Sequence, residues 1–120
     1  MFRVIIAGGR HMNDYALVEQ KANAFLSRLF EEGEEVVIVS GAARGADRMG
    51  ELYAENQGIE CRTYSAKWDE YGKSAGYKRN TLMAENADAL IAFWDGSSKG
   101  TKHMIDIAKK KGLPVRIVRY

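Results

Sequence analysis

The chain has 120 residues, of which 46% are hydrophobic and 28% are charged, as in an ordinary soluble globular protein. Lysine and arginine outnumber aspartate and glutamate by 18 to 16, and this net charge of +2 lacks the strong basic excess of proteins dedicated to nucleic acid. No apolar run approaches the roughly 20 residues of a membrane span. The single cysteine, Cys61, excludes an intramolecular disulfide. We therefore expect one cytoplasmic domain over residues 1–120.

The first predicted strand, Arg3 to Ala7, ends in a Gly-Gly-Arg turn at residues 8–10. Asn13 or Asp14 can cap the helix that follows. Its apolar face recurs at helical spacing, and the next glycine, Gly33, suits the end of a helix. The residues of this face are Val18, Ala22, Phe25, Leu26 and Leu29.

The second predicted strand, Val36 to Val39, leads through the turn Ser-Gly-Ala-Ala-Arg-Gly-Ala-Asp into a helix from Ala46 to Gln57. A helix that starts in this way points backbone N–H groups at its N-terminal end, where anions and above all phosphate bind. Arg44 adds a planar set of donors suited to phosphate or carboxylate. The turn matches neither G-x-G-x-x-G nor the P-loop, and it could also be a small-residue turn required by packing alone.

The middle of the chain is less regular. Ile59 to Tyr64 predicts a short strand near the edge of the sheet, and the polar segment from Ser65 to Tyr77 predicts a loop. Its aromatic residues, Trp68 and Tyr71, either stack on a ligand or cover the sheet edge. A third helix is expected to begin with Lys78-Arg79-Asn80, with an inner face of Leu82, Met83 and Ala87.

The last third of the chain begins with an almost continuously apolar strand from Ala89 to Trp94, which is typical of a central position. The turn from Asp95 to Thr101 leads into a helix, and Pro114 to Val118 form a fifth strand. This alternation of strands and helices predicts an α/β, three-layer Rossmann-like fold with a five-stranded, mostly parallel sheet and helices on both faces. The inner face of the last helix is expected to be Thr101, Met104, Ile105 and Ala108.

Polar and glycine-rich turns follow the carboxyl ends of the predicted strands, whereas the opposite turns are short and plain. Ligands of open α/β sheets bind outside those carboxyl ends. We therefore predict a site for a nucleotide or nucleotide-derived ligand there, with Asp47 and Asp95 as the candidate catalytic carboxylates if the protein is an enzyme. The candidate ligand-binding residues are Gly8, Gly9, Arg10, Ser40, Gly41, Arg44, Gly45, Asp47, Arg79, Asn80, Asp95, Gly96, Ser97, Ser98, Gly100 and Thr101.

Several other side chains at this edge extend the prediction. Lys99 and Lys102 are further donors, and Trp94, like the two loop aromatics, could stack on a base. His11, His103 and Cys61 are scattered and lack the spacing of metal ligands. We expect no metal and no required cofactor.

Four motifs occur in order along the chain: Ile-Ile-Ala-Gly-Gly-Arg, Ser-Gly-Ala-Ala-Arg-Gly-Ala-Asp, Arg79-Asn80 with Met83, and a long motif from Ala87 to Ile105. Together they resemble the YspA/YpsA-related SLOG family, within the superfamily of DNA-processing protein A and the lonely-guy enzymes. The resemblance covers nearly the whole chain. It implies a Rossmann-like fold and a site for nucleotides or nucleotide-derived ligands, without implying one activity.

The chain departs from its relatives at a few positions. Ala42 stands where many relatives have glycine, His11 where they have aspartate, and Gly76-Tyr77 where they have Gly-Pro. The catalytic glutamate of the lonely-guy phosphoribohydrolases would fall at Met104, and Gly96-Ser97-Ser98 replaces their Pro-Gly-Gly. Because methionine can neither stabilise an oxocarbenium-like transition state nor position water, the resemblance does not carry that catalytic machinery to this chain.

Three functions therefore stay open. The first is a binding module that senses, sequesters or carries a nucleotide-derived ligand. The second is a phosphoribohydrolase-like hydrolase of a nucleotide or N-glycosidic bond that uses Asp47 or Asp95. The third is single-stranded nucleic-acid binding as in DNA-processing protein A, which the small net charge disfavours. The sequence does not decide whether copies of the chain form a homo-oligomer.

Overall fold

The computed structural model describes residues 1–120 and contains a five-stranded sheet in which every strand pair is parallel. The strands follow the order β3-β2-β1-β4-β5, so β3 lies at an edge and β4 lies inside the sheet, as predicted. The α/β three-layer, Rossmann-like prediction is confirmed. The strands are β1 (Phe2–Gly8), β2 (Val36–Ser40), β3 (Glu60–Thr63), β4 (Ala89–Trp94) and β5 (Val115–Arg119).

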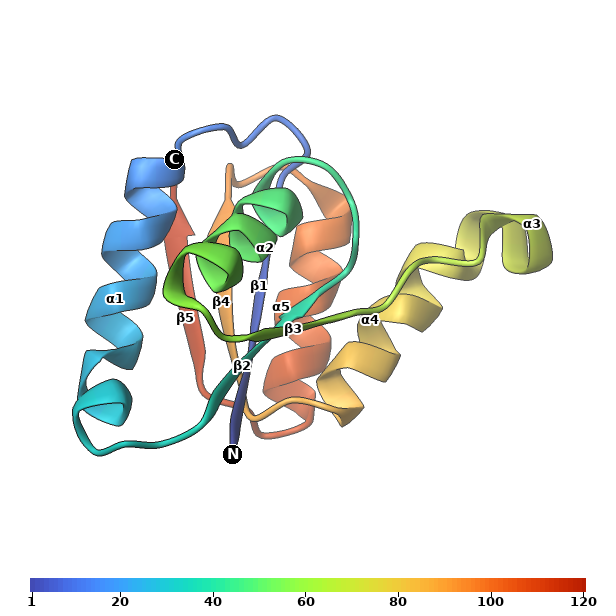
Figure 1. Cartoon of the computed structure of the whole chain (residues 1–120). Helices are drawn as coiled ribbons and strands as arrows, with labels where there is room; N and C mark the ends of the chain where they lie inside the picture. Colours follow the sequence, from blue (N-terminus) through green and yellow to red (C-terminus); the bar gives the residue numbers. More distant parts are fainter.

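Helices cover both faces of the sheet (Figure 1). The helices α1 (Tyr15–Glu31) and α2 (Ala46–Gln57) pack on one face, and α4 (Ala75–Glu85) and α5 (Lys99–Lys110) pack on the other. Of the two predicted caps for α1, Asp14 is the one used, because its carboxylate accepts the Leu17 N–H at 3.1 Å. None of the helices is both long and apolar enough to cross a bilayer.

The core consists of two apolar layers, because successive residues of a strand point to opposite faces of the sheet. On β1, Val4 and Ile6 pack toward α1 and α2, whereas Ile5 and Ala7 pack toward α4 and α5. A sheet buried on both faces requires apolar residues at consecutive positions. This explains why β1, β2 and β4 are almost continuously apolar.

The segment after β3 differs from its prediction as a loop. It forms a short helix, α3 (Trp68–Tyr71), and a single 3-10 turn, Gly72–Ser74, and α4 then begins at Ala75, three residues earlier than expected. A Cβ at position 76 would lie 3.3 Å from the Trp68 ring, so glycine lets the indole approach this turn of α4. We call residues 65–77 the arm; α3 lies far from the sheet (Figure 1).

The predicted inner face of the third helix was partly wrong. Leu82 is 47% exposed, whereas Met83 and Ala87 are buried as expected. The buried face also includes Asn80, three residues before Met83, and Ala84, three residues before Ala87. Leu82 is two residues from both Asn80 and Ala84, and at about 100° per residue this places it on the opposite side of the helix from this face.

The order of the strands creates one reversal of winding direction, between β1 and β4. The chain builds outward from β1 through β2 to β3, then crosses back to β4 on the other side of β1. In doubly wound sheets, ligands bind outside the carboxyl ends of the strands at this reversal. The turns after β1, β2 and β4 meet there, so the fold brings the glycine-rich turns together.

Candidate functional site

A cleft of about 780 Å³ opens at the carboxyl edge of the sheet. Ligand pockets for small molecules commonly have volumes of about 300–1,000 Å³. Most of the predicted site residues line it: Gly8, Gly9, Arg10, Gly41, Arg44, Asp47, Arg79, Asn80, Asp95, Ser98, Gly100 and Thr101.

Other predicted residues lie outside the lining of the cleft: Ser40, Gly45, Gly96, Ser97, Lys99, Lys102, Tyr71 and Trp94. Trp94 is half-buried, and its indole N–H donates to the Ser98 carbonyl at 3.1 Å. The lining also contains residues that were not predicted as ligand contacts. They belong to the arm and to the last position of the sequence: Ser65, Lys73, Tyr77 and Tyr120.

The turn between β2 and α2 depends on Gly45. Its φ is +83°, a conformation that side chains rarely adopt, and a Cβ would collide with the Gly9 carbonyl and lie 2.7 Å from the Cα of Arg10. The same Gly9 carbonyl accepts the Ala46 N–H at 3.1 Å. Gly45 therefore allows the turns after β1 and β2 to pack backbone against backbone.

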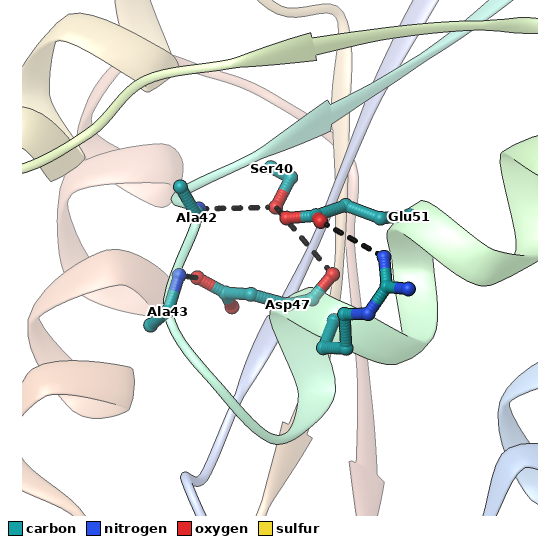
Figure 2. A network of polar contacts seen from close by, with 6 residues as sticks. Ser40, Ala42, Ala43, Asp47 and Glu51 are labelled. Atoms are coloured by element: carbon teal, nitrogen blue, oxygen red, sulfur yellow. Dashed lines mark hydrogen bonds and ion pairs between the residues drawn. The ribbon is translucent and has the colours of Figure 1, made fainter.

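Ser40 holds this turn through the hydrogen bonds of its hydroxyl group (Figure 2). Its side chain is fully buried, and its hydroxyl accepts the Ala42 N–H at 3.1 Å and donates to Glu51 Oε2 at 2.8 Å. Both hydrogen-bonding roles of the hydroxyl are therefore used within the protein. Ser40 shapes the turn, and it is not placed to contact a ligand.

Asp47 is a buried carboxylate in the floor of the cleft. The Ala43 N–H donates to its Oδ2 at 3.2 Å (Figure 2). Burial raises the pKa of Asp47 to about 6, although the Ala43 hydrogen bond and the charge of Arg79 act in the opposite direction. A carboxyl group with such a pKa can hold or release a proton near neutral pH.

Arg79 and Asn80 connect α4 to both neighbouring turns. The Arg79 guanidinium donates through Nη1 to the Gly41 carbonyl at 2.6 Å and through Nε to Asn80 Oδ1 at 3.0 Å. The amide nitrogen of Asn80 donates to the Gly100 carbonyl at 3.3 Å. The Asn80 amide is thus occupied by the protein, whereas Arg79 Nη2 has no hydrogen-bond partner in the chain.

The start of α2 is open toward the cleft. No side chain caps it, and the backbone N–H groups of Arg44, Gly45, Asp47 and Arg48 have no acceptor within the chain. A helix start of this kind carries about half a positive charge. It therefore offers several unused donors to an anion.

The start of α5 is already capped by its own side chains. The Ser98 hydroxyl accepts the Thr101 N–H at 3.4 Å. Asp95 Oδ1 accepts the Ser97 and Ser98 N–H groups at 2.8 and 2.9 Å, and these two hydrogen bonds hold the pKa of Asp95 below its ordinary value. This second helix start at the cleft thus carries a negative charge of its own.

The charge of the cleft lining is positive. Arg10 and Arg44 take part in no ion pair, and Arg79 and Lys73 add two more cations against the carboxylates of the two aspartates. Met104 lines the same cleft and brings no carboxylate to it. The arrangement suits an anionic ligand with its negative group at the start of α2.

Comparisons with known proteins place this chain in a family. The family described as "YspA, cpYpsA-related SLOG family" matches residues 2–71, which include the turns after β1 and β2. "Gene 61 protein" of Mycobacterium phage D29 is 36% identical to this chain over 121 residues, covering 96% of this chain and 94% of the phage protein. No solved structure matches the chain.

Proposed function

The chain belongs to the YspA, cpYpsA-related SLOG family, and from this premise we propose that it binds a nucleotide or nucleotide-derived ligand in the cleft. The observation that carries the proposal is the uncapped start of α2, whose free N–H groups lie beside arginines without ion-pair partners. Backbone donors, the helix dipole and guanidinium groups are the features that bind phosphate in proteins.

The phosphate is placed between the turns after β1 and β2 in this proposal. Arg10 and Arg44 reach it from these two turns, and the free Nη2 of Arg79 supplies a further donor from α4. The cleft is large enough for the sugar and base as well as the phosphate. The second oxygen of Asp95, which makes no hydrogen bond in the chain, is available to a ribose hydroxyl.

A thermal-shift panel tests this proposal on the wild-type protein and Arg44→Ala. The panel contains mononucleotides, cyclic nucleotides, dinucleotides, ADP-ribose-type compounds and inorganic phosphate. A ligand at about 100 times its Kd should stabilise the fold by about 2.7 kcal/mol, which raises the Tm by several degrees. We expect such a shift with the wild type and its loss in Arg44→Ala. No shift with any member of the panel would contradict the proposal.

A second candidate function is hydrolysis of a nucleotide or N-glycosidic bond, favoured by the pKa of about 6 for Asp47 in the floor of the cleft. Asp95 is less suited to proton transfer at neutral pH, because its hydrogen bonds hold its pKa low. Any ligand found in the panel would be incubated with the protein and analysed for products. Hydrolysis predicts turnover that Asp47→Asn abolishes while binding persists, and intact ligand after prolonged incubation would exclude it.

A further inference from the structure

The arm gives the cleft an aromatic wall. Trp68 of α3 and Tyr77 of α4 both line the cleft, and they are 50% and 47% exposed. The neighbouring Tyr71 is exposed as well, but it lies outside the cleft lining, and the Lys78 ammonium sits 4.8 Å from the centre of its ring. Two of the three arm aromatics thus face the space where the ligand is proposed to bind.

The Tyr77 ring is held in place by its neighbours. It stacks on the His103 ring of α5, with ring centres 4.3 Å apart and planes inclined by 29°. His103 Nδ1 lies 3.2 Å from the amide nitrogen of Asn80, which is nearly fully buried. Since the Asn80 oxygen accepts from Arg79, its nitrogen faces His103, and Nδ1 acts as the acceptor of a neutral ring. The chain of contacts therefore fixes the orientation of Tyr77 before any ligand binds.

Trp68 is positioned by its contact with Gly76 of α4. The edge of the indole lies against Gly76, where an added Cβ would be only 3.3 Å from Cη2. Gly76 is also the residue next to Tyr77, so the two rings lie on the same short piece of the arm. The two rings come from the arm and the start of α4, whereas the free N–H groups, Arg10 and Arg44 come from the turns after β1 and β2.

We propose that Trp68 and Tyr77 form a stacking platform for the planar base of a nucleotide whose phosphate binds at the start of α2, and that this platform accepts different bases. The inference rests on the proposed function. Stacking on an aromatic ring tolerates changes of base because every base has a π-face. Discrimination between bases requires buried hydrogen-bonding groups in fixed positions. The polar side chains that the arm itself brings to the cleft lining, Ser65 and Lys73, are both exposed.

Calorimetric titration of the full chain tests the platform with AMP, GMP, CMP, UMP and ribose 5-phosphate, which has no base. We expect the four nucleotides to bind within about tenfold of one another, and ribose 5-phosphate to bind more weakly than all of them. Trp68→Ala and Tyr77→Ala should each weaken AMP binding by about 5- to 150-fold and leave ribose 5-phosphate binding unchanged. Tyr77→Phe keeps the ring and should bind AMP as the wild type does.

Tyr71→Ala is the matched control, because Tyr71 is an exposed aromatic residue of the same arm outside the cleft lining. It should bind AMP with wild-type affinity. Fluorescence gives an independent measure, since the chain has two tryptophans and Trp94→Phe leaves Trp68 as the sole indole. Stacking predicts that AMP quenches this fluorescence and that ribose 5-phosphate does not.

The results that overturn the platform differ from those that overturn the proposed function. Equal binding of AMP and ribose 5-phosphate by the wild type, or full AMP affinity in both alanine variants, would exclude the platform while the phosphate site stands. A preference for one base by more than about 100-fold would exclude base tolerance. Absence of binding by all five compounds would contradict the platform, and the proposed function falls as well if no member of the thermal-shift panel binds.

Discussion

The two helices that begin at the cleft, α2 and α5, have the same length of 12 residues but opposite starts. The start of α2 has a glycine cap, no side-chain acceptor at its N-cap and a flanking arginine. At the start of α5, Ser98 and Asp95 accept the N–H groups of Ser97, Ser98 and Thr101 and bring a carboxylate to the donors that stay free. Glycine-rich turns precede both helices in the sequence. On the proposal that the anion binds at α2, a glycine-rich turn before a helix is not sufficient for an anion site, and the acceptors that the protein itself brings to the turn matter as well.

The largest difference in stability should appear when one glycine at each helix start is replaced by alanine. Gly45→Ala should lower the free energy of unfolding by about 3 kcal/mol or more, because backbone strain and overpacking each cost about 1–3 kcal/mol. Its matched control is Gly100→Ala in the first turn of α5, where a Cβ would meet nothing within 4 Å. That variant should be neutral or stabilised by up to about 1 kcal/mol. Urea denaturation measures both, and similar stabilities of the two variants would refute the contrast.

The two aspartates should respond to pH with opposite signs. The folded pKa of Asp47, about 6, exceeds its ordinary 3.8, so its contribution is fully present below about pH 4 and is lost as the pH rises through 6. At pH 7.5, Asp47→Asn should therefore raise the free energy of unfolding by up to about 3 kcal/mol, at about 1.4 kcal/mol per unit of pKa. At pH 4 the two proteins should be nearly equal in stability.

Asp95→Asn supplies the opposite case. The folded pKa of Asp95 is lowered, so its contribution is present above its unfolded pKa and is lost as the pH falls through the folded pKa. This variant should be less stable than the wild type at pH 7.5, with a difference that shrinks on acidification. Denaturation curves at a series of pH values check both aspartates, and changes of the same sign at pH 7.5 would contradict the assignment.

The cations at the two helix starts should differ in ligand binding. Arg44→Ala removes charged hydrogen bonds to phosphate worth about 1.5–3 kcal/mol, so the affinity for AMP should fall by about 10- to 150-fold. Lys99→Ala, at the start of α5 and outside the cleft lining, should change it less than about threefold. Calorimetry measures both Kd values. A larger loss of AMP affinity in Lys99→Ala than in Arg44→Ala would indicate that the anion binds at the start of α5.

The smallest effect concerns Ala42, whose φ of +61° lies in the left-handed region. Ala42→Gly removes about 1–2 kcal/mol of backbone strain but increases the entropy of the unfolded chain. The net change should be a stabilisation of about 0.5 kcal/mol, measured by urea denaturation. Ala43→Gly, at a neighbouring position without positive φ, should destabilise the protein, and an equal effect of the two changes would argue against strain at Ala42.

Most of the fold could be predicted from periodicity and turn residues, because the apolar strands and the amphipathic α1 and α5 leave little choice of structure. The arm could not. Its polar sequence predicted a loop, and the role of Gly76 becomes apparent only when Trp68 is seen against it. Leu82 was wrongly assigned to the buried face of α4 because it is apolar. That face instead includes the polar Asn80, which is buried because its amide is hydrogen-bonded within the protein.

The location of the cleft could also be predicted, since the carboxyl ends of parallel strands meet at one edge. What each residue does there could not. Ser40 and Asn80 have side chains typical of ligand contacts, yet their polar atoms are used within the protein. Tyr77 was missed because its stacking partner, His103, lies on another helix. Partners distant in the sequence decide whether a polar or aromatic group is free, and they are visible only in the fold.

The most direct test of the central claim, that the ligand's anionic group binds at the open start of α2, is a backbone amide NMR titration with ribose 5-phosphate. This compound has no aromatic ring and so adds no ring-current shifts. We predict that the amide signals of Arg44, Gly45, Asp47 and Arg48 shift most, because these N–H groups lack acceptors in the free protein. Larger shifts at residues 97–101 of the α5 turn, or none at the start of α2, would contradict the account.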